Sequence, residues 1–344
     1  MTSSTGSPPS ERTSTSGLSC EVLTTHSAAL SSVDRLFGSG INATIFHHPR
    51  FLSYHSADKF PHAEWRHYLF SLKGNPVAFL PGAAVNEEQL TYRSPLGSTH
   101  GGLVHAALSF AKLDECLNLW WEDIQQQGFE RAEIVLPPLP YSEPNFSEAV
   151  ELKLNHLGFV LHEPLLCPIV PITPGPDFPR HLLRTTAWQK CKQARARGVT
   201  VRYSTEVAAD LELFYPILVE NRRRFGVVPT HSLEELLRIH SLCPEALHLF
   251  LATAHGQPVA GILVFQATPL VVNTFYIADV ESGRDARAVD LLLLETYKWA
   301  LERSVRWVDL GPSSYRLEVN WTLTHFKEGH GGRTFLRRPY VWHR

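Results

Sequence analysis

The sequence predicts an α/β fold with mixed sheets, built from two similar units in tandem. The first observation is an internal repeat, in which YLFSLKGNPVAFL at 68–80 matches FLATAHGQPVAGIL at 250–263. Each copy has two apolar stretches joined by Gly, then Asn or Gln, then Pro, which is typical of a β-hairpin. Two copies separated by roughly 180 residues indicate two related units within one chain.

A second correspondence follows each hairpin. In the first half, the helix-like segment 113–128 leads to the strand-like segment 132–138. In the second half, 290–304 leads in the same way to 307–312. Both halves therefore contain a hairpin, a helix and a strand in the same order, as expected for two α/β units of one kind.

A proline-rich stretch, PIVPITPGPDFP at 168–179, is the expected boundary because it is stiff and cannot continue a helix. We therefore expect an N-terminal domain over 21–175 and a C-terminal domain over 176–344. Residues 1–20 are rich in Ser and Thr and have little to bury, which predicts a disordered tail.

Composition favours a cytoplasmic enzyme without a membrane span. The chain has 344 residues, 44% of them hydrophobic, which is enough for two cores. No apolar run approaches the length of a membrane-spanning helix, and the N-terminus lacks the apolar region of a secretory signal. The five cysteines are scattered without CxxC spacing, which indicates reduced thiols. No HExxH pattern is present either, so no metal site is expected.

Charge is distributed unevenly along the chain. Residues 180–224 contain 10 Lys or Arg against 4 Asp or Glu, a net charge of +6, while the whole chain carries −2. This block includes RTTAWQKCKQARARG at 184–198 and NRRRFG at 221–226. It is either a solvated helix face or a docking surface for a polyanion, such as RNA or a phosphorylated cofactor.

The C-terminal segment NWTLTHFKEGHGGRTFLRRPY, 320–340, contains the most specific pattern. A short predicted helix carries Lys327 and then meets three glycines, at 329, 331 and 332. Glycines let the backbone approach a ligand or another strand closely. Two interpretations follow: a helix C-terminus at which Lys favours the dipole, or a lysine directed into a cleft.

This ending resembles the FemAB-like branch of the GNAT acyltransferase superfamily. Members of that branch end in a strand, an Asp/Gly/Ser turn, Asn-x-x-Leu-x-x-x-Lys-Glu-Gly-x-Gly and a closing strand. The matching pieces here are RWVDLGPSS (306–314), Asn320, Leu323, Lys327, Glu328, Gly329 and Gly331. The similarity extends to 227–240 and, more weakly, to 94–104 and 137–144. It implies tandem GNAT domains over most of the chain.

The resemblance also implies the reaction, an aminoacyl transfer that forms an amide bond. GNAT enzymes that use coenzyme A bind its pyrophosphate with a Q/R-x-x-G-x-G/A loop, and the equivalent segment 275–295 has only Gly283, with Arg284 and Arg287 within reach of a phosphate. FemAB-type enzymes generally lack this loop and use aminoacyl-tRNA. We therefore expect aminoacyl-tRNA as co-substrate, no bound cofactor, no DNA partner and a small-molecule amine as acceptor. The alternatives are an acyl-CoA-dependent N-acyltransferase acting on an amino sugar or small amine, and a non-catalytic binding protein, which the presence of Lys327 disfavours.

Carried over residue by residue, the resemblance implies Lys327 and Asn320 as catalytic residues, with Lys327 neutralising charge on the reacting ester. The substrate-binding candidates are Tyr276, Asp309, Ser313, His231, Arg222 and Arg223. The tRNA-binding candidates are Arg184, Lys190, Lys192, Arg195 and Arg197. Two of these have a structural alternative: His231 precedes a predicted helix N-cap at Ser232, and Asp309 can satisfy backbone donors in its own turn.

Overall fold

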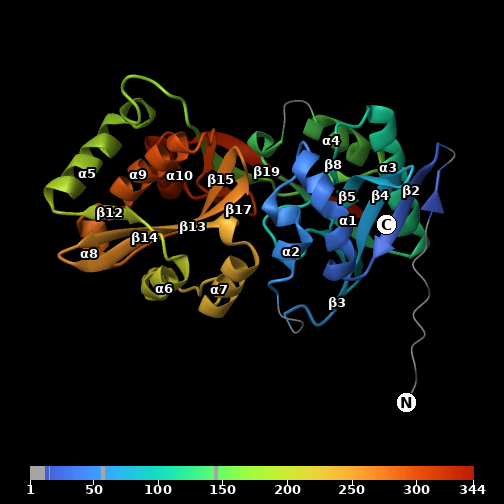
Figure 1. Ribbon diagram of the computed structural model, residues 1–344, viewed down its shortest axis with the longest axis horizontal. Coiled ribbons are helices and arrows are strands. Elements are labelled where there is room, and N and C mark those ends of the chain that lie inside the picture. Colours follow the sequence, from blue (N-terminus) through green and yellow to red (C-terminus); the bar gives the residue numbers. More distant parts are fainter. Residues whose placement is uncertain (1–11, 15, 56–58, 143–145) are drawn as a thin grey trace, which may run out of the picture. The chain divides into compact units, whose positions relative to one another are not determined.

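The computed structural model describes residues 12–14, 16–55, 59–142 and 146–344. The chain divides into two compact units (Figure 1). The first comprises the residues up to Pro164 together with the C-terminal segment Arg337–Arg344, and the second comprises Leu165–Leu336. The expected boundary at 175/176 lies later than the observed one. The reason is that Leu165–Pro171 forms strand β11, which pairs with a strand of the second unit.

The first unit contains two groups of strands. The order of one group is β1-β2-β4-β5-β8, with bounds Arg12–Thr13, Leu18–Leu23, His67–Leu72, Asn75–Leu80 and Val104–His105. The other group pairs in the order β3-β6-β7-β9-β19, with bounds Ala63–Trp65, Ala83–Asn86, Leu90–Ser94, Arg131–Leu136 and Arg333–His343. Short β10, Val160–Leu161, also pairs with β19.

Helices of the first unit are α1 (His26–Ser39), α2 (Pro49–Leu52), α3 (Phe110–Gln126) and α4 (Phe146–His156). The central one is α3, which begins at the N-cap Ser109 and buries one apolar face. Fully buried Trp120 on that face joins a core that includes Tyr68 and Tyr92.

Strand β2 corrects the expectation of a disordered tail over 1–20. Leu18 is 0% exposed and Cys20 is 1% exposed, and the strand pairs along its length with β4. Strand β1 extends this edge by pairing with β2, and the Arg12 guanidinium pairs with Asp123 on α3 at 2.8 Å. Ser/Thr-rich composition hid a strand of only six residues. Residues 1–11 lie outside the described part of the chain.

One mixed sheet forms the centre of the second unit. Strands β12, β13, β14 and β15 pair antiparallel, β16 is parallel to β15, and β11 is antiparallel to β16. The bounds are Thr200–Tyr203, Leu247–Ala254, Gln257–Thr268, Val271–Asp279 and Trp307–Asp309 for β12 to β16. A small hairpin, β17 (Ser314–Tyr315) and β18 (Glu318–Val319), follows β16.

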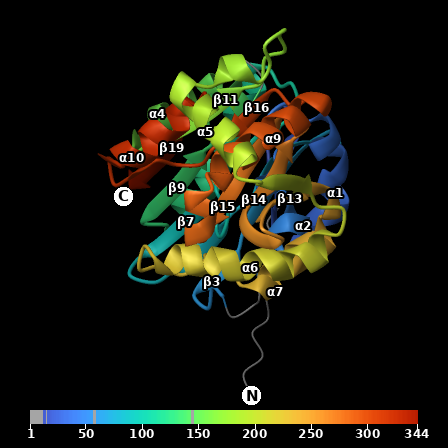
Figure 2. The ribbon, with the colours of Figure 1, turned by 90° about the vertical axis from the view of Figure 1, so that its left-hand side faces the viewer.

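Helices cover both faces of this sheet (Figure 2). On one face lie α5 (Thr185–Ala196) and α9 (Ala288–Glu302), and on the other lies α6 (Val207–Arg223). The remaining helices are α7 (Leu233–Leu242), α8 (Glu281–Asp285) and α10 (Trp321–Gly329). Buried leucines of α9 pack against apolar side chains of β13 and β14, which makes one continuous core.

The structure confirms the fold class and the hairpin repeat. The two hairpins are β4–β5 and β13–β14, and each turns through two residues with positive φ: Lys73 (52°) with Gly74 (76°), and His255 (50°) with Gly256 (77°). Each hairpin also has a bulge at the same place. The pairing register shifts between Phe70 and Ser71 in one hairpin and between Ala252 and Thr253 in the other, and Ser71 and Thr253 are the residues that face the proline. The same turn and the same bulge in both copies explain why the two sequences align.

Candidate active site

The candidate site lies where β15 and β16 separate in the second unit. The two strands are paired in parallel from Val271/Trp307 to Asn273/Asp309, and there β16 ends while β15 continues to Asp279. Within the described residues, no strand pairs with this edge of β15 beyond Asn273. We call this opening the notch. It is a place where the edge of a strand can meet a substrate.

The loop that leaves β16 is fixed by Asp309. Its carboxylate accepts a hydrogen bond from the Gly311 N–H at 2.7 Å, and the Thr274 hydroxyl donates to the Asp309 carbonyl oxygen at 3.1 Å. Asp309 is 0% exposed. The structural alternative for Asp309, satisfying backbone donors in its own turn, is therefore observed, and its substrate-binding role stays a prediction.

Lys327 lies on α10 and reaches this loop. Its side chain is 4% exposed, and its Nζ donates to the carbonyl oxygens of Gly311 at 2.8 Å and Pro312 at 2.9 Å. Ser313 is buried beside them, and its carbonyl oxygen accepts from the Asn320 N–H at 2.8 Å. The fold thus brings four predicted residues, Asp309, Ser313, Asn320 and Lys327, to one short loop.

Asn320 has a clear structural role. It is the N-cap of α10, and its side-chain oxygen accepts from the Leu323 N–H at 3.0 Å. The side chain is exposed, so this hydrogen bond orders the start of the helix that carries Lys327. Its catalytic role remains a prediction.

The glycine run after α10 approaches the protein's own backbone. Gly331 has φ of 93°, and a side chain there would meet the Leu182 carbonyl oxygen at 2.7 Å. A side chain at Gly332 would meet Pro168 at 2.8 Å. Of the two possibilities left open by the sequence, a ligand or another strand, these contacts show neighbouring chain segments, and they position α10 against β11 and the start of α5.

A second group of predicted residues surrounds Tyr276 on β15. The Tyr276 hydroxyl accepts from the His231 N–H at 3.1 Å and lies 3.0 Å from the His231 Nδ1. The Arg222 guanidinium lies 5.4 Å from the centre of the tyrosine ring. Burial raises the pKa of Tyr276 and lowers the pKa of Arg222. His231 also precedes a complete capping box formed by Ser232 and Glu235, as the sequence predicted.

A buried charge at the end of β15 was missed by the sequence reasoning. Asp279 contacts Arg284 at 3.0 Å, Arg224 at 3.5 Å and the Asn221 amide at 3.0 Å, and burial raises its pKa. A side chain at Gly283 would meet the Val259 carbonyl oxygen at 2.3 Å. This glycine is therefore required by packing on β14, and Arg284 is engaged with Asp279. The sequence did contain a signal for this contact, because Asp279 ends a predicted strand and is followed by Arg284 and Arg287 in the next turn.

The remaining basic candidates lie in the second unit at its surface. Helix α5 buries Ala187, Cys191 and Ala194 and turns its charged side chains outward. Arg195 pairs with Glu295 at 2.8 Å, and Arg184 pairs with Glu328 at 3.3 Å. The other candidates are Lys190, which is half-buried, and Lys192, Arg197 and Arg223, which are exposed. Both readings of the basic block, solvated face and docking surface, require this outward orientation.

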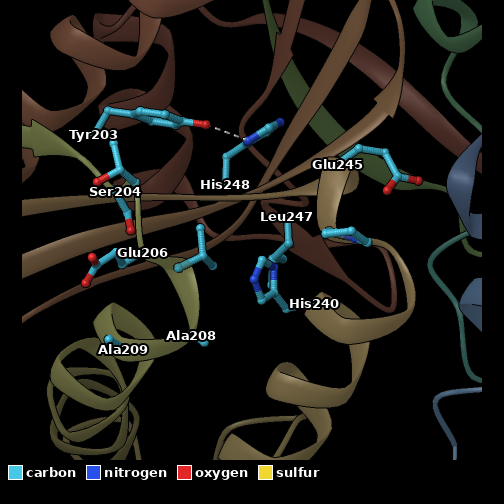
Figure 3. A pocket seen from close by; sticks show the side chains of 12 residues that line it. Tyr203, Ser204, Glu206, Ala208, Ala209, His240, Glu245, Leu247 and His248 are labelled. Carbon is cyan, nitrogen blue, oxygen red and sulfur yellow. Dashed lines mark hydrogen bonds between the residues drawn. The ribbon is translucent and has the colours of Figure 1, made fainter.

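A separate open pocket of about 670 Å³ lies at the end of β12 and the start of β13 (Figure 3). It is lined by Tyr203, Glu206, His240, Glu245 and His248, among others. The Tyr203 hydroxyl lies 3.1 Å from the His248 Nδ1, and burial lowers the pKa of His248 to about 4. None of the predicted site residues lines this pocket.

Among the described residues, every helix is too short or too polar to span a bilayer. The same residues contain no group of three or more His, Cys, Asp or Glu side chains placed to hold a metal ion.

Comparison with known proteins finds a family match within the second unit and structural similarity over most of the chain. Residues 183–328 match the family model described as acetyltransferase (GNAT) domain. FemX is structurally similar over 94% of this chain and 97% of its own, with a TM-score of 0.69 and 13% identity. The L-PGS from Bacillus licheniformis is similar over 91% of both chains, with a TM-score of 0.58 and 11% identity. No curated protein sequence matches this chain significantly.

A third structure is similar over 85% of this chain and 90% of its own, with a TM-score of 0.57 and 12% identity; it is described as the C-terminal DUF2156 domain of a lysylphosphatidylglycerol synthetase from Agrobacterium fabrum. Residues 183–328 thus match a GNAT acetyltransferase domain, which supports an acyltransferase activity. The whole chain is similar in fold to FemX.

Proposed function

We propose that the protein transfers an aminoacyl group from aminoacyl-tRNA to the amine of a small molecule. The observation that carries the proposal is the buried ammonium group of Lys327, held at the notch inside the acyltransferase domain. A buried ammonium group at the loop that leaves β16 is suited to an anion that forms only during reaction. Such a reaction requires charged tRNA, so the proposal places the enzyme in the cytoplasm.

The chemistry is an aminolysis of the aminoacyl ester. The amine nitrogen attacks the ester carbonyl, a C–N bond forms, and a tetrahedral oxyanion appears. The C–O bond to the ribose then breaks, and a proton from the amine ends on the ribose oxygen. Lys327 supplies positive charge, while alternate N–H groups along the open edge of β15 supply hydrogen-bond donors. Holding both substrates at the notch provides the remaining acceleration.

Two features support tRNA over coenzyme A as donor. The turn after β15 packs Gly283 onto β14, and Arg284 contacts Asp279, so these groups are committed within the protein. The second feature is the basic α5, whose charged side chains face outward. One structural neighbour is named a lysylphosphatidylglycerol synthetase, and the lysyl group in that name agrees with an aminoacyl donor. The family description acetyltransferase favours the second candidate, an acyl-CoA-dependent N-acyltransferase.

The decisive experiment offers the two donors separately to the purified protein with a panel of small amines, and detects amide products by mass. We expect product from charged tRNA and none after ribonuclease treatment. If acyl-CoA gives product even after ribonuclease treatment, and charged tRNA gives none, the protein is an acyl-CoA-dependent N-acyltransferase.

A charge reversal tests the role of α5. Arg195→Glu with Arg197→Glu places two acids on an exposed face, so folding should be little affected. Affinity for charged tRNA should fall, and its dependence on salt should become shallower because fewer phosphates are contacted. The double variant Glu206→Lys with Glu245→Lys, at the separate pocket, provides a matched surface control. If the α5 variant keeps the affinity and the salt dependence of the wild type, α5 is a solvated helix face and not a docking surface for tRNA.

A further inference from the structure

Exposed rings gather on the β17–β18 hairpin and on the first turn of α10. Tyr315 is 69% exposed, Trp321 is 64% exposed and Leu317 is 63% exposed. Arg316 lies over the Tyr315 ring, with its guanidinium 5.3 Å from the ring centre. Large aromatic side chains dominate cores and interfaces, so a Tyr and a Trp exposed close together in sequence indicate a binding surface.

The hairpin is held rigidly at its base. The Leu166 N–H donates to the Ser314 hydroxyl at 2.8 Å, and the Ser313 N–H donates to the Leu166 carbonyl oxygen at 2.7 Å. The tip is strained, since Arg316 and Leu317 have φ of 47° and 65° without being glycine. Left-handed backbone is unfavourable for residues with a side-chain Cβ. The hairpin therefore exposes these side chains to solvent at a cost in folding stability. Backbone strain of this kind often occurs at functional sites.

The position of the hairpin connects it to the notch. It begins at Ser314, two residues after Pro312, and the carbonyl oxygens of Gly311 and Pro312 accept hydrogen bonds from Lys327. At the far end of α10, the Arg184 N–H donates to the Gly329 carbonyl oxygen at 2.9 Å, and there α5 begins. Helix α10 has nine residues and so spans about 13 Å. Exposed rings, a buried cation and a basic helix thus follow one another along a short path.

We propose that Tyr315, Arg316 and Trp321 form a stacking platform for the unpaired bases at the 3′ end of the tRNA donor. The inference rests on the proposed function and extends it by naming the subsite. Single-stranded bases bind by stacking on aromatic rings and on guanidinium planes, while basic side chains hold the phosphates. A single-stranded 3′ end fits this arrangement because its ester must reach Lys327 while the paired stem meets α5. The mixed charge of the hairpin, Arg316 beside Glu318, does not suit insertion into a lipid surface.

Binding is measured with a fluorescein-labelled single-stranded RNA of the sequence of a tRNA 3′ end, and with the same RNA made abasic at its last residues. We expect Tyr315→Ala and Trp321→Ala each to weaken binding of the intact RNA by roughly 10-fold or more, and binding of the abasic RNA much less. Trp321→Phe keeps a ring and should retain most of the affinity. Phe225→Ala is the matched control, since Phe225 is 63% exposed and also lies under an arginine, but at the end of α6.

Transfer kinetics separate this inference from the proposed function. The alanine variants should raise the KM for charged tRNA by a similar factor and leave kcat nearly unchanged, because the platform contacts only the donor. If the wild type uses charged tRNA while both variants keep the affinity and KM of the wild type, the platform is wrong and the proposed function stands. If the wild type does not use charged tRNA, both fail. Loss of binding to anionic phospholipid vesicles, with RNA binding unchanged, identifies a membrane-contact surface instead and overturns the platform.

Discussion

The two units carry comparable lysines in different surroundings. In the first unit, Lys153 lies on α4, the helix that follows β9; in the second, Lys327 lies on α10, the helix that follows β16. Both side chains are 4% exposed. The Lys153 Nζ pairs with the Asp114 carboxylate at 2.6 Å, whereas the Lys327 Nζ donates to the carbonyl oxygens of Gly311 and Pro312.

The loops after the two strands differ in a complementary way. In the first unit, the Pro137 carbonyl oxygen after β9 accepts from Arg338 at 3.1 Å, and Arg338 also pairs with Glu151 at 3.0 Å. The first unit thus matches its cations near this loop with carboxylates. In the second unit, Lys327 donates to neutral carbonyl oxygens of the loop that follows β16. The two lysines therefore differ in these acceptors, and we propose that Lys153 has a structural role and that Lys327 stabilises an anion during the reaction.

The largest expected effect concerns the edge strand of the first unit. Deleting residues 1–20 removes Leu18 and Cys20, which are 0% and 1% exposed, and half of β2. Loss of these two buried side chains should cost at least about 4 kcal/mol of unfolding free energy. Calorimetry should show the transition of the first unit moving to much lower temperature. Deleting only residues 1–11 is the control, and an equal melting temperature for both truncations contradicts the assignment of β2 to the core.

Acid should destabilise the first unit more than the second, in which His248 also has a lowered pKa. Burial lowers the pKa of His47 to about 4 and of His67 to about 3, against about 6.5 in the unfolded chain. Both folded-state values are depressed, so the stabilisation is complete above pH 6.5 and is lost as pH falls towards 4. At pH 5 each histidine costs about 2 kcal/mol relative to pH 8.

Hydrogen exchange at pH 8 and pH 5, corrected for intrinsic rates, measures this difference. Peptides from α3 and β4 in the first unit should lose protection at pH 5, and peptides from α9 in the second unit should lose less. If the two units lose the same protection at pH 5, the expected difference in their acid stability is wrong.

The functional half of the comparison is tested at Lys327. Lys327→Met keeps the length of the side chain and removes its charge, so turnover should fall roughly 100-fold, the effect of losing one group that stabilises an oxyanion. The structure adds a stability cost, about 1–3 kcal/mol, because two loop carbonyl oxygens lose their donor. Turnover per folded molecule therefore has to be measured below the melting temperature. Full turnover in a folded variant confines Lys327 to holding the loop.

Lys153→Met is the matched variant and has the smallest expected effect. Its partner Asp114 is 36% exposed, so solvent screens the pair and breaking it should cost only about 1–2 kcal/mol. Turnover at the notch should stay within about twofold, as for a change outside the site. A drop in turnover as large as that of Lys327→Met, in a protein that remains folded, contradicts the division of roles between the two lysines.

Local signals in the sequence predicted the repeated hairpins and the capping box at Ser232 correctly. Lys73-Gly74 and His255-Gly256 form two-residue turns in which the second residue is a glycine, and such turns depend on neighbouring residues alone. The β17–β18 hairpin escaped prediction because its turn, Arg316-Leu317, has none of the residues that usually mark a two-residue hairpin.

Partners set by the tertiary fold were not predictable. Lys327 contacts backbone carbonyl oxygens, which have no signature in a sequence, so its burial did not follow from the C-terminal motif. The segment 165–171 is apolar and proline-bounded, and nothing local reveals that it pairs with β16. The same holds for Arg338–His343, expected in the C-terminal domain but paired with β9 of the first unit. Strand alternation fixes which side chains share a face, not which sheet receives the strand.

The pairing of β19 with β9 has a consequence for the order in which the two units are completed during synthesis. The second unit contains β11, which leaves the ribosome before the rest of that unit, whereas β9 of the first unit pairs with Arg338–His343 of β19, which is made after the second unit. Domains usually fold in the order in which they are translated. In this chain the first unit stays incomplete, with one edge of β9 unpaired, until the second unit has been synthesised. A ribosome that stalls before Arg338 therefore carries a nascent chain whose earliest domain is the unfinished one.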